Sequence, residues 1–237
     1  MTYTENAAAA ALSVSAAMAS RRSIRAFQDT PVEPALLREI MAKAQRAPSG
    51  GNVQPWHVAV VTGDALGNVI TAVQQAMMAG GGIADGEYVI YPPGLPEPYM
   101  ARRYGVAHAM YDAMGIERSD RMARNMAMAQ NFTGFGAPVV AFVHCPRFMG
   151  PPQWADIGIY LQSLMLLLRE AGLDSCPQEA WSIYGKQVRD ALAIGDDHIL
   201  YAGLAIGWRD AAAPVNNFAV DRAPLDEVVA WHGFDAG

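Results

Sequence analysis

Three short runs of apolar residues, Trp56–Thr62, Pro138–Cys145 and Ile199–Ile206, limit the folds that the chain can adopt. They are rich in aliphatic and β-branched residues, which predicts buried β-strands, and a further strand is expected at Leu173–Pro177. Longer segments with helical patterns separate them, and no internal repeat is found. We therefore expect a fold that mixes helices and strands, with strands at Trp56–Thr62, Pro138–Cys145, Leu173–Pro177 and Ile199–Ile206.

Helices are expected where good helix formers or amphipathic patterns follow a start signal. Pro34 suits a first helical turn, and Asp64 is expected to cap a helix that reaches about Met78. Further helices are expected at Ala7–Met18, Tyr99–Met114, Glu117–Gln130, Trp154–Ala171 and Lys186–Leu192.

The glycines and prolines between residues 80 and 98 break any regular element, so this stretch is expected to be a long loop. Loops of this length inside a domain are usually lids or binding segments. No linker separates two domains. We expect a single domain over residues 1–237, with residues 80–130 forming a lid or helical excursion.

Composition excludes several classes of protein. Hydrophobic residues make up 52% of the chain and charged residues 17%, which predicts extensive contact between subunits. A net charge of −6 with 17 Lys and Arg argues against a nucleic-acid binder. The chain has no long apolar run that would span a membrane and no typical secretory signal. With two unpaired cysteines, it is expected to be cytoplasmic.

The most informative polar segment is Arg21-Arg22-Ser23-Ile24-Arg25. A guanidinium group is always charged and presents a planar fork of donors that matches two phosphate oxygens at once. Three such groups in one short stretch predict a phosphate site. The alternative is a solvated turn between helices, because short basic runs are common at protein surfaces.

A second polar segment, Ala47–Trp56, lies between an expected helix and an expected strand. Two prolines fix its ends, two glycines allow close backbone approach, and Ser49, Asn52 and Gln54 offer short polar groups. Such a loop suits a planar ligand that is rich in donors and acceptors. The alternative is an ordinary turn.

Taken together and in this order, four segments resemble the FMN-dependent nitroreductase family over nearly the whole chain. They are Arg21–Phe27, Ala47–His57, Gly172–Glu179 and Arg222–Leu225. The resemblance implies an α+β fold built as a three-layer α/β/α sandwich. It also implies a homodimer with swapped terminal segments that binds one FMN in each of two interface sites.

The resemblance also implies roles for particular residues, carried over by position. The residues that would contact the FMN phosphate, ribityl chain and pyrimidine edge are Arg21, Arg22, Ser23 and Arg25. Arg222 would also bind the phosphate.

The loop between the second helix and the first strand would approach the flavin from the partner subunit, through Pro48, Ser49, Gly50 and Asn52, with Gln54 in the same loop. The segment Pro177, Gln178 and Glu179 would pass along the isoalloxazine ring, with a backbone N–H near Glu179 directed at the flavin N5. No side chain is expected to be catalytic.

Tyr91–Tyr99, Asn131-Phe132 and Phe135–Pro138 resemble the nitrobenzoate-reducing branch of the family. The activity implied is the reduction of nitroaromatic compounds by NADH or NADPH in a ping-pong cycle. Two alternatives stay open: reductive dehalogenation of halogenated aromatics on the same fold, and a flavin-binding protein without catalytic turnover.

Other polar residues are given plainer interpretations. The five histidines lack the spacing of metal ligands, so no metal site is predicted, and His57 is expected to be a core or interface residue. Arg102 and Arg103 have two interpretations. They would either receive an aromatic carboxylate or a nucleotide phosphate, or lie on a solvated helix face.

Overall fold

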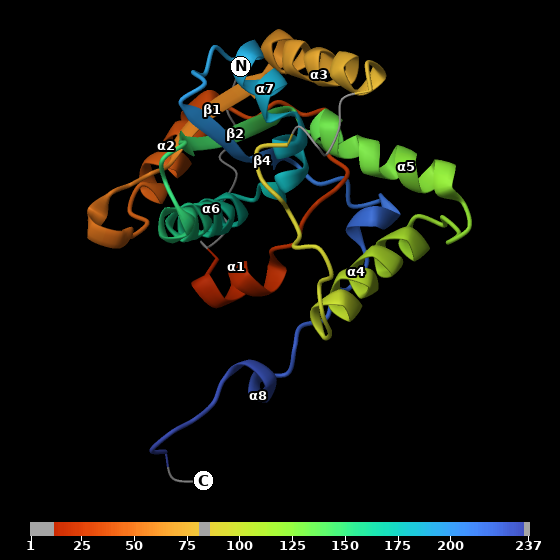
Figure 1. The fold of residues 1–237 in the computed structure, drawn as a ribbon. Helices are drawn as coiled ribbons and strands as arrows, with labels where there is room; N and C mark the ends of the chain where they lie inside the picture. Colours follow the sequence, from red (N-terminus) through yellow and green to blue (C-terminus); the bar gives the residue numbers. More distant parts are fainter. Residues whose placement is uncertain (1–11, 81–85, 235–237) are drawn as a thin grey trace, which may run out of the picture.

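The computed structural model of the chain describes residues 12–80 and 86–234, and its centre is a four-stranded antiparallel sheet (Figure 1). The strands lie in the order β1-β2-β4-β3, so β1 and β3 form the edges. All four expected strands are present with ends shifted by a few residues: β1 (His57–Thr62), β2 (Val139–Pro146), β3 (Asp174–Gln178) and β4 (His198–Gly207).

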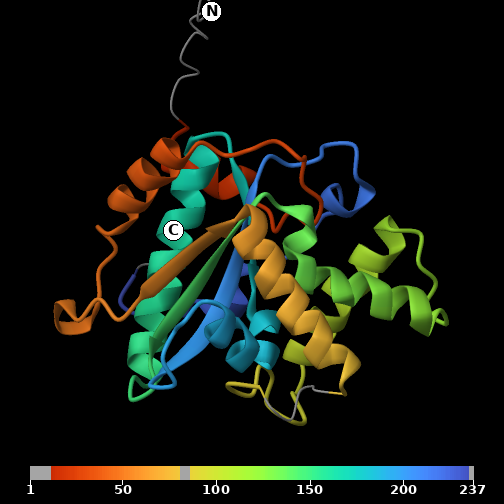
Figure 2. The ribbon, with the colours of Figure 1, turned by 90° about the horizontal axis from the view of Figure 1, so that it is seen from above.

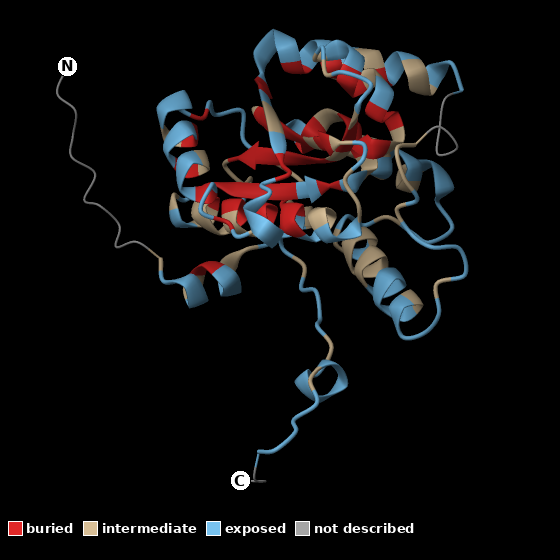
Figure 3. Cartoon of the chain, turned by 60° about the vertical axis from the view of Figure 1, so that its left-hand side comes forward, coloured by how far each residue is buried: buried red, intermediate tan, exposed pale blue. Residues whose placement is uncertain are grey.

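Burial of the sheet follows from its position between two layers of helices. The central strand β2 is fully buried from Val139 to Val143, whereas Val60 on the edge strand β1 is 44% exposed. The buried strands are red in Figure 3. A strand covered on both faces is apolar at every position instead of every second one, which is the pattern seen in the sequence of β2.

One face of the sheet is covered by α2 (Pro34–Ala44) and α6 (Pro151–Glu170), and the other by α3 (Gly63–Met78) and α7 (Gly185–Ala191) (Figure 2). Each helix presents an apolar stripe to the sheet. In α6 this stripe includes Leu161, Leu164 and Leu168, at the spacing of successive helical turns. The expected α+β, three-layer arrangement is confirmed.

Some helix boundaries differ from expectation. The expected cap at Asp64 is wrong, because α3 begins at Gly63 and Thr62 occupies the cap position. Asp64 lies inside the first turn, where its carboxylate interacts favourably with the positive end of the helix dipole. Likewise, α5 (Arg121–Ala129) starts later than expected because the Asp120 side chain accepts a hydrogen bond from Ala123 N (2.9 Å) and caps it there.

The first helix, α1 (Val14–Ser20), begins after Ser13, whose hydroxyl accepts a hydrogen bond from Ala16 N (3.2 Å). The expected residues Ala7–Ala11 of that helix lie outside the described residues, as do residues 81–85 of the expected loop. Residues 86–98 form no regular element, and α4 (Tyr99–Ala113) and α5 lie to one side of the sandwich (Figure 1).

After β4 the chain passes through η5 (Pro214–Asn216) and leaves the body as a C-terminal arm, residues 217–234, that carries α8 (Leu225–Val228) (Figures 1 and 3). Several large apolar side chains of this arm are exposed, among them Trp231 (59%) and Phe234 (73%). Within the described part of the chain, no helix is both long and apolar enough to cross a membrane.

Candidate anion and ligand site

The arginine loop, residues 21–25, follows α1 and runs beside the edge strand β3. Ser23 and Ser175 form a parallel bridge, and Ile24 N donates a hydrogen bond to Ser175 O (3.1 Å). The Ile24 side chain is fully buried and anchors the loop in the core. The flanking Arg21 and Arg25 are only partly buried, so their guanidinium groups remain available to a ligand.

Arg222, from the C-terminal arm, comes close to the arginine loop. The pKa of Arg21 is lowered, first by burial and then by the positive charge of Arg222. Two like charges held near one another in a partly buried place are unfavourable unless an anion lies between them. This convergence supports the expected anion site and brings together segments from the two ends of the sequence.

The candidate arginines bond to backbone carbonyls. Arg22 donates to Phe218 O (3.2 Å), Arg25 to Ser23 O (3.2 Å), and Arg222 to Val220 O (3.1 Å) and Asp221 O (2.9 Å). Within the described ranges, the arginines that form ion pairs with carboxylates are others: Arg102, Arg147, Arg169, Arg189 and Arg209. Because a guanidinium has five N–H donors, the cluster retains donors for phosphate oxygens.

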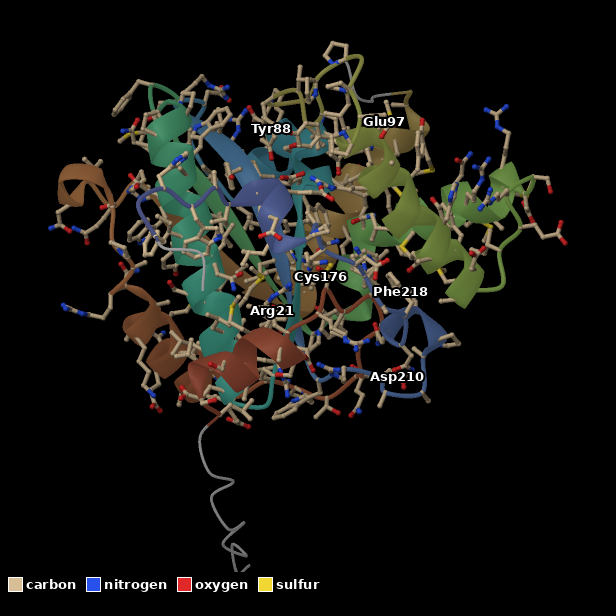
Figure 4. The ribbon with its side chains drawn as sticks, turned by 90° about the horizontal axis from the view of Figure 1, so that it is seen from below. Arg21, Tyr88, Glu97, Cys176, Asp210 and Phe218 are labelled. Carbon is tan, nitrogen blue, oxygen red and sulfur yellow. The ribbon has the colours of Figure 1, made fainter. Side chains whose placement is uncertain are left out.

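Cys176 of β3 lies beneath the arginine loop and is 2% exposed (Figure 4). Burial raises the pKa of its thiol to about 11, against the opposing effects of Arg25, Arg21 and a hydrogen bond with Ser23. The thiol is therefore protonated at neutral pH. It forms part of the floor of the site and is unsuited to act as a nucleophile.

The second polar segment, Pro48–Gln54, is an exposed loop that contains η1 (Gly50–Asn52). Ser49 Oγ accepts a hydrogen bond from Gln54 N (2.9 Å), and Gly50 N donates to both carboxylate oxygens of Asp156 (3.2 Å each). Asn52 and Gln54 have positive φ angles of 58° and 50°. Left-handed backbone in a residue other than glycine is strained, and such strain clusters at binding sites.

Within one chain, this loop and the arginine loop lie at opposite ends of α6 (Figure 2). The first is fixed to Asp156 near the start of α6, whereas Arg169 near its end donates to Ser20 Oγ (3.4 Å), next to Arg21. Asp156 and Arg169 are thirteen positions apart, about 20 Å at the rise of an α-helix. A single chain does not bring the two segments together.

The segment Pro177–Glu179 covers the end of β3 and the start of η4 (Glu179–Tyr184). Gln178 is 2% exposed and its side chain is used in the core: Nε2 donates to Asn131 O (2.7 Å), and Oε1 accepts from Trp181 Nε1 (3.2 Å). Its side chain is therefore not free for a ligand, and its backbone pairs with Gly203 of β4. Pro177 and Glu179 are exposed at the surface.

Beside Glu179 lies an aromatic cluster, Tyr88, Trp154 and Tyr201, which the sequence analysis missed. Tyr88 lies 5.5 Å from Trp154 and 6.1 Å from Tyr201 between ring centroids, and its hydroxyl donates to Tyr201 O. Burial raises the pKa of Tyr88, and the nearby Glu179 carboxylate raises it further. The three residues come from separate elements, and no motif links them.

Glu87 holds the start of the 86–98 segment against the body. Its buried carboxylate pairs with Arg189 (2.8 Å) and Arg147 (3.1 Å), and its backbone N–H donates to Ser182 O (2.9 Å). Gly185 is required at this contact, because a Cβ there would lie 2.3 Å from Glu87 Cγ. This pairing fixes the position of the neighbouring Tyr88.

Three histidines that are scattered in the sequence meet at one end of the sheet. His57 is the cross-strand partner of His144, and His144 Nδ1 lies 2.8 Å from His198 Nδ1. His57 is exposed in the single chain, so the expectation of a core residue is wrong and that of an interface residue stays a prediction. No group of His, Cys, Asp and Glu in the described residues has the arrangement of a metal site.

The second arginine pair is divided between two contacts. Arg102 pairs with Glu227 of the C-terminal arm (2.5 Å), and the Arg103 guanidinium lies 4.0 Å from the centroid of the Tyr91 ring. Both arginines are exposed on α4. The geometry agrees with the interpretation of a solvated helix face.

Comparison with known proteins identifies relatives over most of the chain. Residues 18–208 match the model of the nitroreductase family. The chain is 35% identical over 214 residues to nitrobenzene nitroreductase of Ectopseudomonas oleovorans, covering 89% of this chain and 93% of the relative. It is 32% identical over 225 residues to 4-nitrobenzoate reductase of Pseudomonas putida, covering 93% and 96%.

A solved structure is more similar still. The FMN and NADPH-dependent nitroreductase NfnB from Sphigopyxis sp. strain HMH is 55% identical to this chain and superimposes with a TM-score of 0.92. The match covers 94% of this chain and all of that one. With the family model matched from α1 to the end of β4, the chain belongs to the nitroreductase family.

Proposed function

We propose that the protein is an FMN-dependent oxidoreductase that takes hydride from NAD(P)H and reduces nitroaromatic compounds. The observation that carries this proposal is the arginine loop, which the buried Ile24 and its hydrogen bond to Ser175 of β3 hold in place and which Arg222 of the C-terminal arm approaches. The relatives support it, because those named above are nitrobenzene, 4-nitrobenzoate and FMN and NADPH-dependent nitroreductases.

The chemistry of the donor groups fits the phosphate of FMN. Arginine forks pair with phosphate oxygens two at a time, and the groups proposed to hold the phosphate, ribityl chain and pyrimidine edge are Arg21, Arg22, Ser23, Arg25 and Arg222. The protonated thiol of Cys176 adds no negative charge beneath them. An anion at this place would relieve the repulsion between the guanidinium groups.

The backbone of Pro177, Gln178 and Glu179 is proposed to pass along the flavin ring, with the N–H near Glu179 at N5. FMN, when bound, would supply the two-electron redox chemistry. The aromatic cluster provides apolar surface beside Glu179, which suits an aromatic acceptor. Since NAD(P)H and the acceptor would use the same pocket in turn, we expect ping-pong kinetics.

We propose that the working form is a homodimer with swapped terminal segments. Pro48, Ser49, Gly50, Asn52 and Gln54 lie about 20 Å from the arginine loop along α6, so they would complete the site of the partner subunit. The C-terminal arm exposes Leu225, Val228, Trp231 and Phe234. Exposed apolar surface of this kind is typical of a segment that packs against another subunit.

Two broader proposals accompany this one. Residues 1–237 would form one domain, with residues 80–130 as an excursion that covers the site, since Glu87 fixes its start beside the aromatic cluster. The protein would work in the cytoplasm, where NAD(P)H is available. Its buried free thiols, Cys145 and Cys176, agree with a reducing compartment.

The test uses the purified full chain. It is expected to be yellow, to bleach with NADPH or NADH under anaerobic conditions, and to regain its colour with nitrobenzene or 4-nitrobenzoate. A flavin that no nitro compound reoxidises would contradict nitro reduction, and turnover of iodotyrosine would indicate dehalogenation. Bound FMN that neither nucleotide reduces would indicate a flavin-binding protein without turnover.

A further inference from the structure

Asn216, the last residue of η5, is buried (4% exposed) and lies between the two segments that supply the candidate arginines. Its Oδ1 accepts a hydrogen bond from Arg25 N (2.8 Å). Its Nδ2 donates to Ala26 O and to Asp210 O (2.8 Å each). Both donors and the acceptor of this amide are therefore used, all in contacts with backbone.

These bonds join the arginine loop to the segment that follows β4. Ala26 O also accepts from Asp210 N (3.0 Å), and Gln28 N donates to Trp208 O (2.8 Å). β3 supports the same loop from its other side, through Ser175 O and Ile24 N (3.1 Å). The loop thus lies between β3 and the chain after β4. At the second junction the exposed Gln28 side chain donates to Arg209 O (3.0 Å), and Asn216 supplies the buried side-chain bonds.

The position of Asn216 also controls where the C-terminal arm begins. Phe218, two residues later, accepts a hydrogen bond from the Arg22 guanidinium through its carbonyl (3.2 Å), and Arg222 follows in the same arm. Phe218 and Asp210 lie on either side of this junction (Figure 4). One buried amide therefore fixes the backbone of Arg25, the acceptor for Arg22 and the path toward Arg222.

We propose that Asn216 is a positioning residue for the phosphate grip of the cofactor site. It does not contact the phosphate itself. It acts by fixing the position of the arginine loop relative to the C-terminal arm, so that guanidinium groups from both segments can bind the same anion. The inference rests on the proposed function, because it assumes that the anion is the phosphate of FMN.

The test measures FMN and riboflavin binding to apoprotein by quenching of flavin fluorescence, together with thermal unfolding. In Asn216→Ala, FMN affinity is expected to fall about ten- to fiftyfold, as expected when charge-assisted pairs are misplaced. Riboflavin, which lacks the phosphate, is expected to lose about threefold or less. That difference between the two ligands separates a positioning role from a general loosening of the fold.

Asn217 provides a matched control, because it is the next residue, is exposed, and donates to Ala211 O (2.9 Å) and Ala213 O (3.2 Å). Asn217→Ala is expected to bind FMN as the unchanged protein does. The double variant with Arg25→Ala adds a second criterion. If Asn216 acts through the arginines, its loss costs less FMN affinity once Arg25 is already absent.

Each outcome decides the inference. Equal losses for FMN and riboflavin, or full FMN affinity in a folded Asn216→Ala variant, would overturn it. If the alanine variant does not fold, Asn216→Ser, which retains one donor and one acceptor, takes its place, and failure of both to fold would assign Asn216 to folding alone. If the unchanged protein binds no FMN, the proposed function fails instead.

Discussion

At the scale of single residues, the arginine cluster was predictable because its residues are adjacent in the sequence and its chemistry does not depend on the fold. Arg222 needed the family resemblance, since nothing local marks it. The use of the Gln178 side chain was not predictable, because burial directs its amide to Asn131 O, which no motif reveals. Tyr88 was missed because its partners come from distant elements.

Removing one candidate arginine tests the site directly. Arg21→Ala or Arg25→Ala is expected to weaken FMN binding by about 1.5–3 kcal/mol, because a charge-assisted pair with phosphate is lost. This corresponds to about ten- to 150-fold in the dissociation constant. Arg38→Ala, on the exposed face of α2, serves as control. Unchanged flavin retention in both site variants would contradict their role.

A substitution at Gly185 tests the contact with Glu87 that holds the 86–98 segment. Gly185→Ala places a methyl group on Glu87 and displaces its buried pairing with Arg189, so stability is expected to fall by about 2–4 kcal/mol. Gly67→Ala, in α3 with no atom within 4 Å of the new Cβ, is expected to stabilise by up to about 1 kcal/mol. Chemical denaturation measures the free energy of unfolding of both variants. Equal changes in the two variants would contradict a stabilising role of the Glu87 contact.

At the scale of elements, apolar content made β1, β2 and β4 predictable, and helical periodicity did so for most helices. β3 has the sequence Asp-Ser-Cys-Pro-Gln and lacks that signal. Helix starts were less predictable, because a cap depends on local backbone geometry. Thr62 holds the cap position that was expected for Asp64, and Asp120 caps a helix that was expected to start at Glu117. The histidine cluster was not predictable at all. Cross-strand register brings His57 to His144, and a single sequence does not contain that register.

The histidine cluster predicts a pH dependence. The pKa of His144 is lowered to about 4 by burial and by the neighbouring His198 and His57. His144 is thus neutral in the fold, whereas the unfolded chain takes up a proton near the ordinary pKa of about 6.5. Stability is therefore expected to fall as the pH drops from about 6.5 toward about 4.

Other groups close to this cluster also affect it. Burial lowers the pKa of His198, His57 and Arg189 lower it further, and Asp197 opposes them. Arg147 donates to His198 O (2.8 Å). The difference between the unchanged protein and His144→Asn, measured by urea unfolding at pH 7 and pH 5, isolates the contribution of His144. His232→Asn, in the C-terminal arm, is the control, and the same pH slope in all three proteins would contradict the prediction.

At the scale of the whole molecule, the sequence indicated an oligomer through its high apolar content, and part of the exposed apolar surface lies on the C-terminal arm. Replacing Trp231 and Phe234 by serine is expected to give a monomer in light scattering. The monomer is also expected to lose FMN, because the loop Pro48–Gln54 is too far away to complete its own site. A variant that stays dimeric, or a monomer that retains FMN, would refute the shared site.

The position of α6 has a practical consequence for redesign. One end of this helix supports the arginine loop, and the other end supports the loop that is proposed to complete the site of the second subunit. In the proposed dimer, the length of α6 would therefore set the spacing of the two halves of the binding site, and inserting or deleting a single turn would shift one half against the other by about 5 Å. Engineers who wish to widen the pocket should leave this spacer untouched and vary the segment around Tyr88.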